Sequence, residues 1–394
     1  MSKQEKYLFS LQNRGIKLGL ERTDRLLKIC NSPHKKIKTI QILGTNGKGS
    51  SSAILSQILR NNRLKIGLFT SPHLRSYTER IRVNGLPIDI DNVKYFIDKY
   101  QKEIEKIEAS FFEVMTAMAA WYFNKSKVDY AIMETGLGGK YDSVTACNAN
   151  IFGITSISKD HQNILGNSLK DIASEKVAAI KKKSIVFSVN QKPTVKTIIN
   201  SYCKQNKCIF KQVKKDSRIS LSLNGDHQKE NASLAISIAN HLGANLKNLD
   251  KCLMSIKWFG RNQIIQKNPF IVFDVAHNEQ GIKSFLQFIK SSNQRFDQRY
   301  LLLSIQKTKK IKDISDELND YFDHIYYTIT EKTKSMEFED IKYNIPKAVY
   351  FQNPMTLINK ITSISSKDDL IAIIGTHFWG ETVSNKFNIS FDNL

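Results

Sequence analysis

Short apolar runs recur in the first half of the chain, each bounded by Gly or Ser and separated from the next by a helix-length segment. They are TIQILG (39–44), IGLFTS (66–71), YAIMETG (130–136), IFGITSI (151–157) and SIVFSV (184–189). Runs of this length and spacing predict buried parallel strands that alternate with helices. The first half is therefore expected to form a P-loop-type, doubly wound α/β sheet.

A second series of apolar runs follows, again alternating with helical patterns such as GIKSFLQFIKSS. These runs are FIVFDVAHN (270–278), YLLLSI (300–305), HIYYTIT (324–330), AVYF (348–351) and LIAIIG (370–375). The pattern predicts a smaller Rossmann-like domain. We place the join near SIKWFGRNQ, where Gly260 interrupts the pattern, and predict an ATP-binding domain over 1–257 and a C-terminal domain over 258–394.

Length and composition agree with two soluble domains. The 394 residues exceed what one hydrophobic core usually supports, and 41% hydrophobic with 24% charged residues is ordinary for a globular protein. Neither a secretory leader nor an apolar run long enough to cross a bilayer is apparent, so we expect a cytoplasmic protein without a membrane partner. The five cysteines are scattered and lack a CxxC pair, which argues against a disulfide framework and a zinc ribbon.

The net charge of +22 is a reason to consider nucleic acid as a binding partner. The lysines, however, are spread along the chain in stretches such as AAIKKKSIV and IQKTKKIKD, without a single basic arm or a recognition helix. A solvated lysine-rich surface accounts for this pattern, and we expect no nucleic-acid partner.

The stretch GTNGKGS follows the first predicted strand and precedes a helical pattern. Its glycines let backbone N–H groups close around phosphate oxygens, Lys48 adds a cation, and the Ser50 hydroxyl can reach a magnesium ion. The strict phosphate-loop pattern is not met, because Ile42 stands where its first glycine should be and Gly49 separates Lys48 from Ser50. The order of strand, loop, lysine and helix still predicts a nucleotide-phosphate site.

Further motifs give this loop a specific context. GTNGKGS is followed by SPHL (71–74) and ERIRVNG (79–85), and then by a series of motifs in a fixed order. The series is SFFEV, ETGLGGKYDS, SKDHQNILG, IASEK, GDHQKENASLAI, FGR and DVAHN. Together these motifs closely resemble the folylpolyglutamate synthase and dihydrofolate synthase family of ATP-dependent amide ligases, which are relatives of the Mur ligases.

The resemblance implies an ATP site and a magnesium site, the latter with two ions. Its ATP-binding residues are Gly44, Thr45, Asn46, Gly47, Lys48, Gly49, Ser50, Ser51, Asn231, Arg261, Asp274 and His277. Its magnesium ligands are Ser50, Glu134, His161 and Lys176, the last as a carbamylated lysine. Taken alone, Glu134 would be a solvated turn residue, His161 a core-facing histidine, and Glu175-Lys176 an exposed pair at a helix start.

The resemblance also implies a pocket for a pterin. Its residues are Ser71, His73, Arg80, Phe112 and Asp142. A carboxylate at Asp142 can accept two parallel hydrogen bonds from the donor edge of a pterin, and the Phe112 ring can stack on it. The alternatives are that Asp142 closes a turn, that Phe112 belongs to the core and that His73 is a hydrogen-bonded loop residue.

The implied reaction joins L-glutamate to dihydropteroate, to a reduced folate, or to both, through an acyl phosphate formed from ATP. Lys48, His161, Lys176 and Arg261 are its expected catalytic residues, and a monomer is expected. Lys140, the EKVAAIKKKS stretch, KTKKIKD (307–313) and GTHFWGE (375–381) depart from the family's usual pattern. The role of the 307–313 loop therefore stays open.

Two alternatives are kept. A Mur-type ligase of cell-wall precursors would carry an extra domain before its phosphate loop, whereas only 43 residues precede Gly44. A nucleic-acid-stimulated P-loop ATPase would make the positive charge functional, and would hydrolyse ATP faster when RNA or DNA is added.

Overall fold

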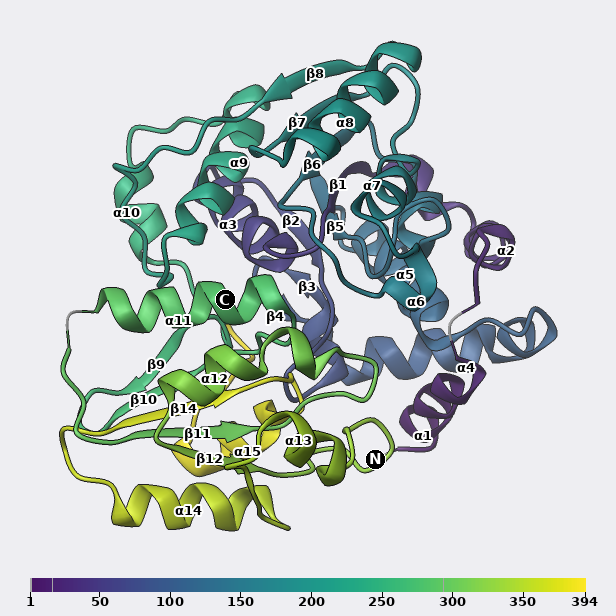
Figure 1. The fold of residues 1–394 in the computed structure, drawn as a ribbon. Coiled ribbons are helices and arrows are strands. Elements are labelled where there is room, and N and C mark those ends of the chain that lie inside the picture. The colour runs from purple at the N-terminus through teal and green to yellow at the C-terminus, as the bar shows by residue number, and fades with distance from the viewer. Residues whose placement is uncertain (1, 16, 293) are drawn as a thin grey trace. The chain divides into compact units, whose positions relative to one another are not determined.

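The computed structural model describes residues 2–15, 17–292 and 294–394 (Figure 1). The chain divides into two compact units. Unit 1 holds the residues up to Leu221 together with Lys229–Ile256 and Asp392–Leu394, and unit 2 holds Ser222–Gln228 and Lys257–Phe391. Each unit therefore contains one short segment that is distant in sequence from the rest of it.

Unit 1 is built on an eight-stranded sheet within the described residues, in the order β4-β3-β2-β5-β1-β6-β7-β8. All neighbouring pairs from β2 to β8 are parallel, and β3 and β4 add an antiparallel edge. The strands are β1 (Lys38–Leu43), β2 (Ile66–Phe69), β3 (Ile81–Val83), β4 (Leu86–Pro87), β5 (Tyr130–Glu134), β6 (Ile151–Ile154), β7 (Ile185–Ser188) and β8 (Ile209–Gln212).

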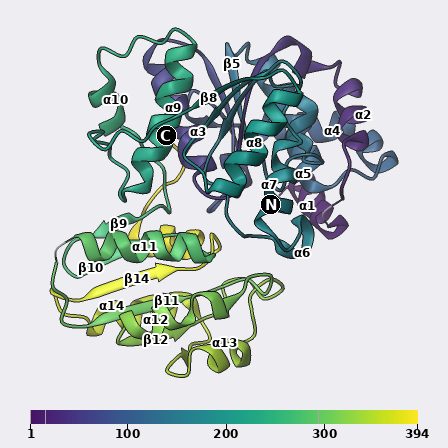
Figure 2. The same cartoon turned by 45° about the horizontal axis from the view of Figure 1, so that its top comes forward.

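Helices cover both faces of this sheet (Figure 2). They are α1 (Lys3–Ser10), α2 (Glu21–Ile29), α3 (Lys48–Asn61), α4 (Ile90–Lys106), α5 (Phe111–Lys125), α6 (Gln162–Leu165), α7 (Leu169–Val177), α8 (Pro193–Gln205), α9 (His227–His241) and α10 (Leu249–Met254). Short 3-10 turns are η1 (Leu11–Arg14), η2 (Pro33–Lys36), η3 (Tyr77–Arg80) and η4 (Ser143–Cys147).

Buried apolar side chains join each helical layer to the sheet. One face packs against α1, α2, α4 and α5 around Phe69 and Met133, and continues to α7 and α8 around Phe152. Two strand glycines allow close packing, because a Cβ at Gly67 would lie 2.7 Å from the Phe123 ring of α5 and one at Gly153 would lie 2.9 Å from Ile238 of α9. The helices therefore lie directly on the strands.

Unit 2 has a six-stranded sheet within the described residues, in the order β13-β12-β11-β14-β10-β9. Its strands are β9 (Gln263–Gln266), β10 (Phe270–Phe273), β11 (Arg299–Leu303), β12 (His324–Tyr327), β13 (Val349–Tyr350) and β14 (Leu370–Ile374). Its helices are α11 (Glu279–Ser291), α12 (Ser315–Tyr321), α13 (Phe338–Asn344), α14 (Pro354–Ile364) and α15 (Trp379–Phe387), with the 3-10 turn η5 (Ile311–Asp313). Apolar residues of α11, α12 and α13 form one core with alternate residues of β10, β11, β12 and β14.

The predicted strands are confirmed in both units, as is the doubly wound α/β fold. The edge strands β4, β8 and β9 were not predicted, because an exposed edge strand lacks a continuous apolar run, and β3, which lies next to the edge, is only three residues long. Several predicted runs extend past the strand ends, so that Ser71 and Asp274 lie in loops. The described helices include none that is long and apolar enough to cross a membrane.

Candidate active site

The loop between β1 and α3 requires glycine at two positions. Gly44 has φ of 143° and a Cβ there would lie 2.0 Å from Oγ1 of Thr155. Gly47 has φ of 89° and a Cβ there would lie 2.2 Å from Oδ1 of Asn231. Both the backbone conformation and the space available therefore exclude a side chain.

The same loop is fixed to the segment that follows β6. The amides of Thr45 and Asn46 donate to the Ser156 carbonyl, at 2.8 and 3.3 Å. Oγ1 of Thr45 accepts from the amide of Ser158 and donates to its carbonyl, both at 3.1 Å. Since the N-cap residue of α3 is Gly47, no side chain at that position accepts from the first-turn amides, and these amides suit an anionic ligand.

Lys48 is the first residue of α3 and is half-buried, with Nζ 3.1 Å from the Thr45 carbonyl. Two buried hydroxyls follow it in the first turn, Ser50 and Ser51. Oγ of Ser51 lies 3.4 Å from Oδ1 of Asn231 on α9. Of the ATP-binding residues that the resemblance implies beyond the loop itself, Asn231 lies in unit 1 beside the phosphate loop, whereas Arg261, Asp274 and His277 lie in unit 2.

Glu134 and His161 lie at the carboxyl ends of strands that flank β1. Glu134 is the last residue of β5 and is 4% exposed, and its Oε2 accepts from the amide of Ser71 at 3.0 Å. His161 has φ of 49° just before α6, and its Nε2 lies 3.9 Å from Oδ1 of Asp160. Glu134 is thus not a solvated turn residue, and His161, whose side chain is 38% exposed, does not face the core.

Lys176 lies in the last turn of α7 and is 5% exposed. The alternative of an exposed pair at a helix start is therefore wrong. Burial, and then the positive charge of Lys48, lower the pKa of Lys176 to about 7, although Asp160, Asp142 and Glu175 oppose the shift. Gly139 packs against this helix, since a Cβ there would lie 2.4 Å from the Lys176 carbonyl.

Asp142 is the N-cap of η4 and is almost fully buried. Its Oδ2 accepts from the Leu137 amide at 2.8 Å and its Oδ1 from the Val144 amide at 3.0 Å. Burial raises the pKa of Asp142 to about 6, while backbone hydrogen bonds and the charge of Lys48 oppose the rise. The carboxylate thus does close a turn, as the simpler interpretation predicted.

Aromatic and basic side chains lie beside this turn. The ring of Phe112, at the start of α5, is only half-buried and lies so close to Gly136 that a Cβ there would be 2.5 Å from Cζ of the ring. Nε of Arg80 donates to Nδ1 of His73 at 2.9 Å, so His73 is hydrogen-bonded in its loop, and the guanidinium lies over the Phe111 ring. Burial lowers the pKa of Arg80 to about 10.

In unit 2 the predicted residues surround the carboxyl end of β10. Asp274 accepts from the amides of Asn262 and Ala276, both at 2.6 Å. Burial raises the pKa of Asp274, while the charge of Arg261 opposes the rise. Nδ1 of His277 donates to the Val275 carbonyl at 2.8 Å. Arg261, Asp274 and His277 therefore belong to one local cluster.

Comparisons with known proteins identify the family. The family model described as Mur ligase, glutamate ligase domain matches residues 260–377. A solved bifunctional folylpolyglutamate synthase/dihydrofolate synthase with Mn, AMPPNP and L-glutamate bound has the same fold, with a TM-score of 0.89 over 99% of each chain at 21% identity. The dihydrofolate synthase/folylpolyglutamate synthase of Bacillus subtilis (strain 168) is 29% identical over 93% of this chain and 94% of its own.

The protein of the same name from Buchnera aphidicola subsp. Baizongia pistaciae (strain Bp) is 30% identical over 87% of this chain and 85% of its own. The chain belongs to the dihydrofolate synthase/folylpolyglutamate synthase family. It is an ATP-dependent ligase of the Mur ligase type, and this assignment is favoured over both alternatives, the cell-wall ligase and the nucleic-acid-stimulated ATPase.

Sequence reasoning missed one carboxylate of this family member. Glu79 is buried and accepts from the amides of Leu74, Arg75 and Ser76, at 3.0, 2.9 and 2.7 Å. It thereby holds the loop that carries His73. The signal was in the sequence, because Ser76 and Glu79 have the S-x-x-E spacing of a capping box, here at the start of η3.

Proposed function

We infer that this ligase joins L-glutamate to dihydropteroate, to a reduced folate, or to both, and converts ATP to ADP and phosphate. The relatives from Bacillus subtilis and Buchnera aphidicola are named for both activities. The related solved structure contains AMPPNP, which is an analogue of ATP, and L-glutamate. The fold of unit 1 and the glycine-rich loop at its central strand are suited to the nucleotide.

One observation carries the proposal. The turn from Gly139 to Asp142 packs against Lys176, since the Asp142 amide donates to the Gly139 carbonyl at 3.1 Å and a Cβ at Gly139 would lie 2.4 Å from the Lys176 carbonyl. The charge of Lys48, 128 and 94 residues away along the chain, acts to lower the pKa of both Lys176 and Asp142. A cation for phosphate, a buried lysine for a metal site and a buried carboxylate for a pterin are therefore within electrostatic reach of one another. A reaction that combines a nucleotide with a heterocyclic acid requires such an arrangement.

The chemistry explains why ATP is needed. A carboxylate does not react with an amine in water, because it has no good leaving group. In the proposed reaction the carboxylate of the pterin substrate attacks the γ-phosphorus of ATP, ADP leaves, and an acyl phosphate forms. The amine of glutamate then attacks the acyl carbon, phosphate leaves with the bonding electron pair, and the amide nitrogen loses a proton. Lys48 and the amides of the first turn of α3 would bind the phosphate oxygens.

The residues at the strand ends fit a divalent cation. The carboxylate of Glu134 and the hydroxyl of Ser50 are oxygen donors of the kind that magnesium prefers, and His161 adds an imidazole. The described residues contain no preformed group of three His, Cys, Asp or Glu side chains, so the proposed set depends on the hydroxyl as well. Such an ion neutralises phosphate charge when it is bound with ATP.

Lys176 fits the carbamylation that we propose for it. An amine reacts with carbon dioxide only when it is neutral, and burial beside Lys48 favours the neutral form. The product is a carboxylate that carries one negative charge. It would supply oxygen ligands for a second magnesium ion and would reverse the charge repulsion between Lys176 and Lys48.

Asp142 and Phe112 are proposed as the pterin contacts. Each carboxylate oxygen of Asp142 accepts a hydrogen bond from the backbone, and a carboxylate has additional lone pairs that can accept from the ring N–H and the exocyclic amine of a pterin. The exposed part of the Phe112 ring is available for stacking. Ser71, His73 and Arg80 belong to the adjacent loop, and we propose that they contact the same substrate.

Four further residues are proposed for the nucleotide. Asn231 lies beside the phosphate loop of unit 1. In unit 2, Arg261 can meet phosphate charge, Asp274 can accept from ribose hydroxyls, and His277 is their neighbour in the same cluster.

Phosphate release tests this function. The purified protein is incubated with ATP, magnesium and bicarbonate, with and without dihydropteroate, tetrahydrofolate and L-glutamate. We expect phosphate release only when a pterin substrate and glutamate are both present, and a product heavier by one glutamyl residue. Hydrolysis that ignores both substrates and rises with added RNA or DNA would contradict the proposal.

A further inference from the structure

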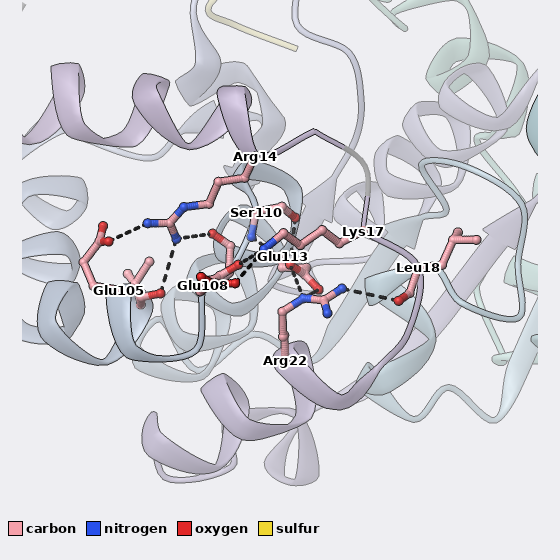
Figure 3. Close-up of polar contacts among 10 residues, drawn as sticks. Arg14, Lys17, Leu18, Arg22, Glu105, Glu108, Ser110 and Glu113 are labelled. Atoms are coloured by element: carbon pink, nitrogen blue, oxygen red, sulfur yellow. Dashed lines mark hydrogen bonds and ion pairs between the residues drawn. The ribbon is translucent and has the colours of Figure 1, made fainter.

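Three basic side chains near the N-terminus contact the region where α4 ends and α5 begins (Figure 3). Arg14 donates to the Ala109 carbonyl at 2.8 Å and pairs with Glu105 at 2.6 Å. Lys17 lies 3.2 Å from both the carbonyl and the carboxylate of Glu108. Arg14 also donates to the Ile104 carbonyl at 3.4 Å, in the last turn of α4, where the helix carbonyl groups favour positive charge.

The third basic side chain, Arg22 on α2, acts on α5 instead. Nε of Arg22 lies 2.9 and 3.2 Å from the two carboxylate oxygens of Glu113. The Glu113 side chain is only 4% exposed, while that of Arg22 is 23% exposed. Oε2 of Glu113 also accepts from the amide and the hydroxyl of Ser110, at 2.7 and 2.8 Å. Glu113 therefore ties the start of α5 both to its own N-cap and to α2.

The turn that Glu113 fixes carries the aromatic wall of the proposed substrate site. Phe111 and Phe112 come directly before Glu113. Phe111 lies under the Arg80 guanidinium, which bonds His73, and Phe112 lies against Gly136 and 5.6 Å from the Phe69 ring centroid. A shift of this turn would move Phe112 relative to the backbone that leads from Gly136 to Asp142.

We propose that Arg22 is a positioning residue for pterin binding. Through its ion pair with Glu113 it holds the first turn of α5, so that the Phe112 ring is kept in place before the substrate arrives. A mostly buried ion pair that joins two helices and is satisfied by further hydrogen bonds suits this role, because removal of one partner leaves the other charge buried and unpaired. The inference rests on the proposed function for the identity of the substrate.

The main test compares substrates in an Arg22→Gln variant. We expect the KM for dihydropteroate to rise about tenfold, since small displacements of positioning groups have effects of about this size or larger, while the KM for ATP changes less than about twofold. Arg22→Lys keeps the charge and should recover part of the loss. Hydrogen exchange at the amides of 111–113 should become faster in Arg22→Gln and remain normal elsewhere in unit 1.

Two controls match the substitution. Lys17→Gln removes an exposed pair from the same N-terminal segment, and Arg299→Gln removes an arginine that forms a comparable pair with Asp323 in unit 2. Lys17 pairs with Glu108, which precedes α5, and Arg299 belongs to unit 2, so both variants should keep the wild-type KM for dihydropteroate. A rise as large as that of Arg22→Gln in either control would overturn the inference.

A double-mutant cycle with Phe112→Ala tests the route of the effect. If Arg22 acts by placing Phe112, Arg22→Gln should raise the KM for dihydropteroate by less than about twofold when Phe112 is already absent. Additive effects would contradict this route. An unchanged KM in a folded Arg22→Gln variant would overturn the inference alone, whereas absence of both dihydropteroate binding and turnover in the wild-type protein would overturn the proposed function as well.

Discussion

Each unit contains a strand, a loop and a helix in the same order, yet the two helices begin differently. In unit 1, β1 leads through Gly44 and Gly47 to α3, whose N-cap is a glycine without a side chain. In unit 2, β10 leads to α11, whose N-cap Asn278 accepts from the amide of Gly281 at 2.9 Å, and Glu279 adds a negative charge to the first turn. The start of α11 therefore has a side-chain cap from the chain itself, which the start of α3 lacks.

The difference between the two helix starts shows how the same strand-loop-helix pattern can serve either ligand binding or stability. A helix start without a side-chain cap keeps amide donors and positive dipole for a ligand, at a cost in stability. A capped start gains stability and keeps less of either for an anion. We therefore expect phosphate chemistry to depend on the start of α3, and the start of α11 to matter mainly for the stability of unit 2.

The sharpest test of this difference is Lys48→Ala. Loss of the cation at the start of α3 should lower turnover at least about a hundredfold, corresponding to about 2.7 kcal/mol or more of transition-state stabilisation. The fold should remain, because Lys48 is half-buried at a helix end and not in the core. Steady-state kinetics and a thermal melt measure both effects, and Lys170→Ala on the exposed side of α7 is a matched control. Retention of more than about a tenth of the rate would remove Lys48 from the reaction.

Lys176→Ala should lower turnover about a hundredfold, because it removes the proposed metal-binding carboxylate. A short carboxylate such as formate should restore part of the activity, since the missing group is an anion, whereas an added amine should not. The intact mass of the wild-type protein in bicarbonate should show the carbamate. A free ammonium in the active enzyme would contradict carbamylation.

The pH dependence of activation gives a second measurement on Lys176. With its pKa lowered to about 7, about half of the lysine is neutral at pH 7, compared with about one part in 3,000 for an ordinary lysine. At constant dissolved carbon dioxide, the rate of activation of the decarbamylated enzyme should rise with pH through about 7 and level off above about 8, where the amine is almost entirely neutral. A rise that continues to pH 10 would indicate an unshifted amine.

Asp142→Ala should lower dihydrofolate synthesis about tenfold or more, because a bidentate pair of pterin donors would be left without an acceptor. Addition of glutamate to tetrahydrofolate, if present, should fall much less. Because Asp142 also accepts from the Leu137 and Val144 amides, each assay needs a thermal melt of the same sample. Equal losses in both activities would indicate a shared pocket or a folding defect.

The raised pKa of Asp142 adds a pH test. A carboxylate whose folded pKa is about 6 is increasingly protonated below that pH and then accepts poorly from a pterin. The KM for dihydropteroate should therefore fall as the pH rises from 5 to 7. The folded chain also binds more protons than the unfolded chain between 3.8 and about 6, so this group makes the free energy of unfolding decrease as the pH rises through that window.

The sequence predicted the central strands well because they are buried on both faces and read as continuous apolar runs. The runs YAIMETG and IFGITSI also locate Glu134 at the end of one strand and His161 just after another, because the strand boundaries alone fix these positions. The edge strands β8 and β9 were not predicted. The residues of β8 are mostly exposed, and those of β9 alternate between partly buried and exposed positions. Local pattern thus reveals buried strands and not the edges of the sheet.

The sequence predicted the residues of the candidate site only where they belong to a recognisable motif. Nothing local indicated that Lys176 is buried or that its pKa is lowered, because the Gly139 turn that packs against it and the Lys48 charge that lowers its pKa come from distant parts of the chain. The contact of Asn231 with the phosphate loop, and the pair of Arg22 with Glu113, likewise join residues about 90 to 180 positions apart. Such long-range contacts have no signature in a single sequence.

The smallest effect that we expect is from a substitution at Asn278, the N-cap of α11 in unit 2. Asn278→Ala removes the side chain that accepts from the Gly281 amide and should lower the free energy of unfolding by about 1 kcal/mol, the usual contribution of an N-cap. Asn278→Asp keeps an acceptor and should preserve stability. Because the proposed phosphate contacts lie at the start of α3, the KM for ATP should change less than about twofold in both variants. Chemical denaturation and steady-state kinetics on the same samples check this pair of expectations. A large rise in the KM for ATP with unchanged stability would mean that the start of α11 takes part in nucleotide binding, and the contrast between the two helix starts would then be wrong.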